Sequence, residues 1–453
     1  MTAPTPLSRR SFLKTTTAGA AAAAVAPSLA FGSRREPFRF AQIGCGGKGE
    51  SDRDAMLNAG AKLVALCDVD ENNAKKVFAK HAELPKYKDY RELLDKHENE
   101  IDGVVVSTPD HVHAAAALDA IRRGKHVYVQ KPLARTFAEC QALLESSRKH
   151  GVVTQMGNQG HAGSGLKLWE ELAKAEAFGD IHHIHTWSDR PIWAQGMTEP
   201  PKESPVPPTL DWNLWLGPAA NRPYGKGYVP FSWRGWWDFG CGAMGDMACH
   251  NMDPAFWIFK LGLPVSIKAQ ASAPAGIAYP SWSIIEYKFG PTPLLPKGVS
   301  LTWYDGKKLP DAPAGASEGY KLSDNGCMVV GSKLTAVGGS HAGSPHVVAL
   351  GDKSDAPAVK EADKHWQDIH RTLKGTDHYG QWVKAAAARD REATKSNFDY
   401  AAPFTQGILL GCIALRFPGQ ELLWDNEKKQ FSNFAEANAW LSFKPREGYN
   451  LNA

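Results

Sequence analysis

The sequence predicts an α/β chain, with an N-terminal domain built on a parallel sheet and a C-terminal α+β domain with a large, open, mostly antiparallel sheet. From Phe38 to about residue 158, short apolar runs alternate with helix-like segments, which is typical of parallel βαβ units. Further along, strand-like runs follow one another across turns, at 281–289, 299–304, 328–330 and 333–337. We therefore predict a first domain of residues 31–158 and a second domain of residues 159–453.

The first domain opens with a strand, a glycine-rich turn and a helix-like segment. The apolar run 38–43 leads into the motif G-x-G-x-x-G, and a second apolar run, 62–67, ends at an acid. In such a motif the glycines permit a tight turn, the approach of a pyrophosphate and close packing of the helix on the strand. The helix N-terminus attracts phosphates, and the acid accepts hydrogen bonds from a ribose diol. The sequence therefore predicts a Rossmann dinucleotide-binding domain with cofactor contacts at Gly44, Gly46, Gly47, Lys48, Gly49 and Asp68.

The βα alternation continues to residue 156. We expect helices and strands in turn at 73–80, 90–97, 104–107, 114–123, 126–129, 137–150 and 152–156, of which 104–107, 126–129 and 152–156 are strands. Polar loops follow two of these strands at their carboxyl ends, where open α/β sheets place their ligands. The loops predict cofactor contacts by Thr108, Pro109, His113, Gln130 and Lys131, although the first loop fits a simple polar turn equally well.

Lys131 is the first candidate for chemistry. It stands between a strand end and Pro132, which disfavours helix for the preceding residue and so allows the ammonium to be aimed. An ammonium there can hydrogen-bond a hydroxyl or carbonyl group and stabilise negative charge that develops on oxygen. A surface lysine at a strand end is the alternative that the spacing leaves open.

The segment Asp246-x3-His250-x2-Asp253 is the second candidate. It lies in a predicted helix, 245–261, where Asp246 and His250 share one face. A carboxylate beside an imidazole can orient the ring and stabilise its cation, as a general base requires. A helix start with a packed histidine is the alternative. Because these spacings without further ligands make a poor zinc signature, we predict no metal site.

The second domain contains weaker candidates as well. We expect a helix at 166–177, a strand at 181–189 and a helix at 401–416, with a long Pro-, Trp- and Gly-rich functional loop at 191–228. Substrate contacts are predicted for residues that also fit structural roles: His161, Trp233, Arg234 and Asp253.

The N-terminus is typical of an export signal. Residues 8–14 read Ser-Arg-Arg-Ser-Phe-Leu-Lys, an Ala-rich segment follows, and Ser28-Leu29-Ala30 is a small-residue cleavage site. We predict that residues 1–30 are a twin-arginine signal peptide, that the protein is periplasmic or exported, and that the mature chain has no membrane span. Because this pathway exports folded proteins, we expect a tightly bound cofactor.

Charge and cysteine content restrict the possible partners. The net charge of +4 is small for 453 residues and gives no reason to expect nucleic acid or an anionic membrane as a partner. The seven cysteines match neither a zinc nor a disulfide framework, so we expect buried free thiols, with a disulfide possible in an oxidising compartment.

The order of the motifs G-x-G-x-x-G, T-P-x3-H, K-P and D-x3-H-x2-D resembles the glucose–fructose oxidoreductase / inositol dehydrogenase / rhizopine-catabolism (Gfo/Idh/MocA) family, over nearly all of the mature chain. The resemblance implies a Rossmann domain for NAD or NADP, a second domain for substrate binding and oligomerisation, carbohydrate-type substrates and a homo-oligomer. It places the catalytic residues on Lys131, Asp246 and His250. The family usually has Glu where this chain has Gln130. No Arg follows Asp68, so we expect NAD rather than NADP.

The residues and the resemblance together predict hydride transfer between NAD and a hydroxyl carbon of a sugar, cyclitol or derivative. In this hypothesis His250 takes the hydroxyl proton, Asp246 orients His250, and Lys131 polarises the oxygen. One alternative is a redox-neutral glycosidase that oxidises, eliminates, hydrates and re-reduces at the same site. Another is a non-catalytic dinucleotide-binding sensor, against which the intact set of three residues argues.

Overall fold

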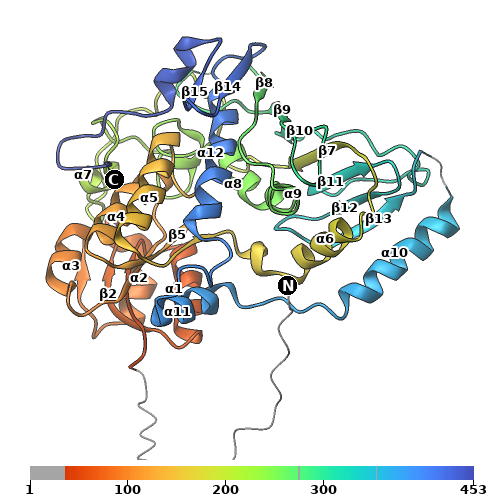
Figure 1. Cartoon of the computed structure of the whole chain (residues 1–453). Helices are drawn as coiled ribbons and strands as arrows, with labels where there is room; N and C mark the ends of the chain where they lie inside the picture. The colour runs from red at the N-terminus through yellow and green to blue at the C-terminus, as the bar shows by residue number, and fades with distance from the viewer. Residues whose placement is uncertain (1–35, 274–275, 353–354, 453) are drawn as a thin grey trace, which may run out of the picture. The chain divides into compact units, whose positions relative to one another are not determined.

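The computed structural model describes residues 36–273, 276–352 and 355–452 (Figure 1). The predicted signal peptide, residues 1–30, lies outside the described residues. Within them, no helix combines the length and the apolar character that a membrane crossing needs. The seven cysteines are buried and unpaired, as the sequence predicts.

A six-stranded sheet forms the first part of the described chain, in the order β3-β2-β1-β4-β5-β6. Its strands are all parallel, with bounds β1 Arg39–Ile43, β2 Lys62–Cys67, β3 Lys86–Tyr87, β4 Gly103–Val106, β5 His126–Gln130 and β6 Thr154–Gly157. Burial on both faces explains why these strands read as apolar runs. Strand β1 has β2 on one side and β4 on the other, and a ligand crevice opens at such a switch point.

Helices connect the parallel strands and confirm the predicted alternation. They are α1 Lys48–Asn58, α2 Glu71–Lys80, α3 Tyr90–His97, α4 Asp110–Arg122 and α5 Phe137–His150. Helix α5 begins with a capping box between Thr136 and Glu139 and ends at Gly151 with a φ of 64°. Helix α4 begins at Asp110, earlier than predicted, because the polar residues after Pro109 form its first turn instead of a loop.

A nine-stranded sheet forms the second part, in the order β13-β12-β11-β7-β10-β9-β8-β14-β15. The β7–β10 pair is parallel and the other pairs are antiparallel, which confirms the predicted α+β character. The bounds are β7 Ile181–Ser188, β8 Ser266–Ala271, β9 Ser283–Phe289, β10 Val299–Asp305, β11 Asn325–Gly331, β12 Thr335–Gly338, β13 Pro345–Ala349, β14 Glu421–Asp425 and β15 Gln430–Phe431. Helices α6 Ser164–Lys174 and α12 Phe398–Ala414 accompany this sheet.

The helix predicted at 245–261 is wrong as a single element. It is two helices, α8 Gly242–Asn251 and α9 Asp253–Phe259, because Pro254 has no N–H for a continuing helix and stands in the first turn of α9. The loop predicted at 191–228 contains one short helix, α7 Trp212–Leu216.

Helix α11 His378–Ala388 was not predicted, and neither was α10 Ala356–His370. Helix α11 returns to the parallel sheet, where Trp382 is fully buried and its ring lies 5.2 Å from that of Phe38. A late segment of the chain therefore completes the core around the first strands. The sequence pattern of α11 reveals an apolar face but not the sheet that covers it.

Candidate functional site

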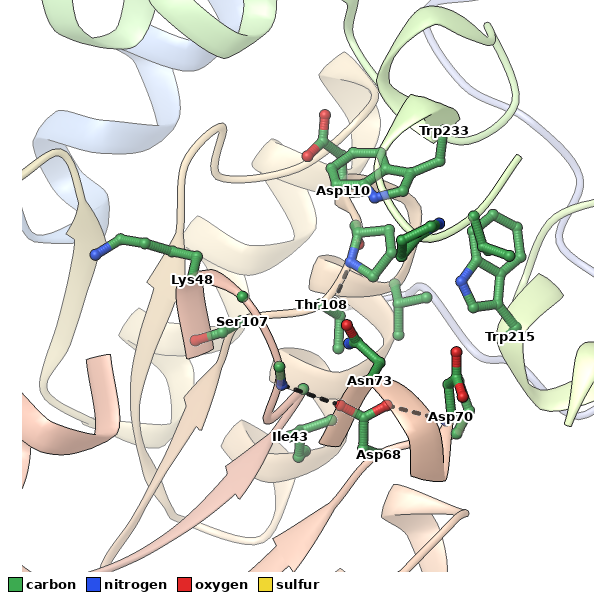
Figure 2. A pocket seen from close by; sticks show the side chains of 18 of the residues that line it. Ile43, Lys48, Asp68, Asp70, Asn73, Ser107, Thr108, Asp110, Trp215 and Trp233 are labelled. Carbon is green, nitrogen blue, oxygen red and sulfur yellow. Dashed lines mark hydrogen bonds between the residues drawn. The ribbon is translucent and has the colours of Figure 1, made fainter. Parts of the chain in front are cut away.

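A cavity of about 270 Å³ lies at the carboxyl ends of the parallel strands (Figure 2). The glycine turn after β1, Asp68 after β2, the loop after β4 and Lys131 after β5 line one side of it. Trp233 and Arg234 from the 3-10 helix Ser232–Gly235, and Asp246 from α8, line it as well. The cavity therefore brings together residues from both halves of the described chain.

The glycine turn has the geometry that a pyrophosphate requires. Gly44 has a φ of 84°, and a Cβ there would lie 2.6 Å from the carbonyl oxygen of Ser107. A Cβ on Gly49 would lie 2.2 Å from the carbonyl oxygen of Gly44, so only glycine lets α1 approach β1 this closely. The N–H groups of Gly47 and Lys48 make no backbone hydrogen bond within the described residues. Two donors at a helix N-terminus are thus available for an anion.

Asp68 joins the end of β2 to the glycine turn. Its Oδ2 accepts hydrogen bonds from the backbone N–H of Cys45 at 2.8 Å and of Gly46 at 3.3 Å, and its Oδ1 accepts one from Asp70 at 3.0 Å (Figure 2). Burial raises the pKa of Asp68, although these N–H donors oppose the shift. A carboxylate oxygen accepts more than one bond, so Asp68 can still serve a ribose diol while it holds the turn.

Lys48 and Gln130 both face Asp52, a fully buried acid on α1. Lys48 Nζ lies 2.8 Å from Asp52 Oδ1, and Gln130 Nε2 donates to both carboxylate oxygens at 3.0 and 2.9 Å. Ser107 and Tyr379 donate to Asp52 as well. The Lys48 side chain points away from Asp68 (Figure 2), and its ammonium group pairs with Asp52. Sequence reasoning missed Asp52.

Lys131 and Asp246 form the centre of the charged cluster. Lys131 Nζ donates to Asp246 Oδ1 at 2.8 Å and to the Asp246 carbonyl oxygen at 2.7 Å, and each side chain is 16 % exposed. Arg234 Nε adds a longer contact to Asp246 Oδ1, at 3.4 Å. Burial disfavours the charged carboxylate, but Lys131 and Arg234 outweigh burial and lower the pKa of Asp246. Asp246 therefore fixes the lysine amine at the cavity.

The expected hydrogen bond between Asp246 and His250 is absent from the described residues. The two residues share a face of α8, but two cations attract the Asp246 carboxylate more strongly than a neutral imidazole does. His250 is 4 % exposed, stacks on His341 with centroids 3.9 Å apart, and leaves Nδ1 without a partner. Burial and then the Lys131 charge lower the pKa of His250, so the ring is neutral at neutral pH. His250 does not line the cavity.

The Asp–His pair of this region is instead Asp253 with His161. His161 Nδ1 lies 3.0 Å from both carboxylate oxygens of Asp253, and Tyr400 donates to Asp253 Oδ1 at 2.5 Å. Both members of the pair are fully buried and neither lines the cavity. This pair joins the 3-10 helix Gln159–Ala162 to α9, whereas the sequence predicted substrate contact for both residues beside a possible structural role.

His113 also lies outside the cavity lining. Its Nδ1 lies 2.8 Å from the Pro132 carbonyl oxygen and its Nε2 lies 2.9 Å from that of Thr108. Burial lowers its pKa to about 4. His113 therefore ties the loop after β4 to the turn after Lys131, while Thr108 and Pro109 themselves line the cavity.

Asp110 is a cavity residue that sequence reasoning passed over, although it stands inside the quoted loop motif. It is 5 % exposed, and the Cys241 N–H donates to its Oδ2 at 3.1 Å. Burial raises its pKa to about 7, against the favourable charges of Arg234 and Lys131. The cavity thus holds a carboxyl group that changes charge near neutral pH.

Asp110 predicts a distinct pH dependence of stability. Its native pKa of about 7 lies above the unfolded value of about 3.9, so the native state holds the proton more tightly between these pH values. This contribution to stability is present below about pH 4 and is lost as the pH rises through about 7. Urea unfolding measures this. The free energy of unfolding of Asp110→Asn should fall less than that of the parent as the pH rises from 5 to 8. In the control Asp119→Asn, on the same helix, the free energy of unfolding should change with pH as it does in the parent. If Asp110→Asn shows the same pH dependence as the parent, the raised pKa of Asp110 is contradicted.

Two family models match the sequence of this chain. The oxidoreductase family, NAD-binding Rossmann fold, matches residues 38–158, and the oxidoreductase family, C-terminal alpha/beta domain, matches residues 182–293. The chain belongs to the Gfo/Idh/MocA oxidoreductase family. The twin-arginine translocation signal sequence matches residues 6–26, so the chain is exported through that pathway.

Two curated relatives illustrate the range of this family. Inositol 2-dehydrogenase of Salmonella typhimurium is 33 % identical over 110 residues, which cover 24 % of this chain and 32 % of that protein. Glycosyl hydrolase family 109 protein 1 of Shewanella sp. (strain MR-4) is 29 % identical over 164 residues, or 33 % of this chain and 34 % of that protein. The chain thus spans about a third of the length of the curated relatives it matches.

Solved structures share the fold over most of the chain. The WlbA dehydrogenase of Bordetella pertussis, in complex with NADH and UDP-GlcNAcA, has a TM-score of 0.60 at 16 % identity and covers 86 % of this chain and 99 % of its own. At this identity the likeness establishes the fold.

Proposed function

We propose that the protein is an NAD-dependent oxidoreductase that acts on a hydroxyl carbon of a sugar, a cyclitol or a derivative. The observation that carries this proposal is the position of Lys131, whose amine is held by Asp246 in the same cavity as the glycine turn and Asp68. The glycine turn and Asp68, which form the proposed dinucleotide cradle, and the fixed Lys131 cation thus lie together at the carboxyl ends of the parallel strands. NAD, when bound, would supply the acceptor for the hydride.

The residues of the cradle fit the proposed cofactor. Gly47 and Lys48 offer backbone N–H groups to a pyrophosphate, and Asp68 offers carboxylate oxygens to a ribose diol. A 2′-phosphate would meet the Asp68 carboxylate, which disfavours NADP. Because the chain is exported folded, we propose that NAD is bound in the cytoplasm and is held tightly afterwards.

Within this proposal, Lys131 donates a hydrogen bond to the substrate oxygen and stabilises its negative charge. Asp246 acts through Lys131 as a positioning residue, which replaces its predicted role beside His250. We retain His250 as the proposed base, because burial and the nearby Lys131 charge keep its ring neutral, and a neutral ring with an unpartnered nitrogen can accept a proton.

The test is an assay of the mature protein with NAD and a panel of sugars, cyclitols and sugar acids. NADH formation with a polyhydroxylated substrate supports the proposal. Sugar release from a chromogenic glycoside without net NADH would instead select the redox-neutral glycosidase. Binding of NAD without turnover of any compound would select the sensor. Mass spectrometry of small molecules that co-purify with the protein identifies the nucleotide directly.

Replacing Asp68 tests the choice of nucleotide. Asp68→Ser should weaken NAD binding by roughly tenfold or more and reduce the preference for NAD over NADP, because the carboxylate that binds a diol and repels a phosphate is lost. Calorimetric titration with both nucleotides measures this. Asp70→Asn, which changes another cavity acid and keeps Asp68, should preserve the preference. An unchanged preference in Asp68→Ser would exclude Asp68 as the selecting residue.

A further inference from the structure

A second cavity, also of about 270 Å³, lies between α5, α12 and the segment near the C-terminus. None of its lining residues lines the cofactor cavity. Its walls carry apolar groups and two guanidinium groups, from Arg135 before α5 and Arg416 after α12. The proposed function makes no use of these residues.

Arg416 lies between two indole rings. Its Cζ lies 3.9 Å from the ring centroid of Trp237 and 3.4 Å from that of Trp440, so both indole rings lie against the guanidinium group. The side chain makes no hydrogen bond and no ion pair with any other described residue. Stacking occupies the faces of a guanidinium group and leaves its N–H edge available for a planar acceptor.

Two further donors at this cavity lack acceptors. Arg135 donates from Nη1 to the Trp237 carbonyl oxygen at 3.1 Å, but its Nε is buried without a partner. The indole Nε1 of Trp237 is buried without a partner too, in a side chain that is 6 % exposed. Buried donors of this kind are normally satisfied, so these two are available to an acceptor bound in the cavity.

The carboxylates nearby are already engaged. Asp238, which lines the cavity, pairs with Arg222. Glu139 accepts hydrogen bonds from Thr136 in the capping box of α5. Burial lowers the pKa of Arg416 to about 10; Tyr279 and Asp238 oppose this shift, and the charge of Arg135 adds to it. Neither Arg135 nor Arg416 forms an ion pair with a described carboxylate, so an anion in this partly desolvated space would be favourable.

We propose that this cavity binds a small organic oxyanion, a carboxylate or a phosphate ester, through Arg416, Arg135 and Trp237. Guanidinium groups bind carboxylate and phosphate oxygens in the plane of their N–H edges, which is the edge that Arg416 leaves available. Phe137, Leu409 and Ile413 provide apolar surface for the body that carries the anionic group.

The test is calorimetric titration of the mature protein with benzoate, acetate and inorganic phosphate at constant ionic strength. We expect saturable binding, and we expect benzoate to bind more tightly than acetate because its ring contacts the apolar wall. Arg416→Gln should weaken binding at least tenfold. If acetate binds more tightly than phosphate, the cavity prefers a carboxylate; the reverse order identifies a phosphate.

Two further variants separate binding from folding. Arg135→Gln removes the second cation together with its hydrogen bond to the Trp237 carbonyl oxygen, and it should also weaken binding. Arg371→Gln removes an arginine that is 72 % exposed directly after α10, and this variant should bind as the parent does. NAD affinity should be the same in all variants. Absence of saturable binding for all three anions would overturn the proposal, and so would unchanged affinity in both cavity variants.

Discussion

Lys131→Met should reduce kcat/KM for the best substrate of the panel by about 10²–10⁴-fold while NAD binding persists. The range is that found when a donor to a developing oxyanion or a general acid–base group is removed. Methionine keeps the length and apolar stem of the lysine and removes the amine that Asp246 holds at 2.8 Å. NADH formation gives the rate, and calorimetry with NAD shows that the cradle is intact.

The matched control is Lys88→Met. Lys88 also lines the cofactor cavity, but its amine pairs with Glu71 at 3.0 Å and is 44 % exposed. This variant should keep most of the activity. Turnover in Lys131→Met that equals the turnover of Lys88→Met would show that the reaction needs no amine at this position and would reject the proposed mechanism.

The role of Asp246 follows from the same experiment. If Asp246 acts by positioning Lys131, then Asp246→Asn should lower activity in the parent and have little further effect in Lys131→Met. If Asp246 instead orients His250, its substitution should remain costly in the absence of the lysine.

The sequence predicted the elements of the parallel sheet closely, since glycines, buried apolar runs and strand-end polar residues act locally. Segments 62–67, 90–97 and 137–150 have the predicted bounds. The partners of charged side chains could not be predicted in this way. Spacing on α8 paired Asp246 with His250, but the structure pairs it with Lys131, which is 115 residues away in the sequence. Such ion pairs depend on which charges the fold brings together, and a local sequence pattern does not contain this information.

The neutral residue at position 130 illustrates the same limit. The sequence shows that Gln stands where the family usually has Glu, but it does not explain why. The structure supplies one: the Gln130 amide donates to both oxygens of Asp52, which is 0 % exposed and lies on another element. An acid at position 130 would meet a buried acid across a gap of about 3 Å.

Gln130→Glu should therefore lower the free energy of unfolding at pH 7 by about 2–5 kcal/mol, because a hydrogen bond is replaced by two buried carboxylates in contact. Lys48, whose side chain is 42 % exposed, cannot neutralise both charges. Urea unfolding followed by circular dichroism measures the loss. The defect should diminish at pH 5, because the new carboxyl group can take up a proton there and donate to Asp52 as the amide does.

The reciprocal exchange gives the decisive control. In the double variant Asp52→Asn with Gln130→Glu, one amide and one carboxylate again face each other, so much of the stability should return. Asp52→Asn alone should be destabilised, since two amides then meet and Tyr379 and Ser107 keep a weaker acceptor. The cycle should show a coupling of about 1–3 kcal/mol in favour of the exchanged pair. If the losses in the free energy of unfolding of the two single variants simply add in the double variant, then Asp52 is not the reason for the glutamine at position 130.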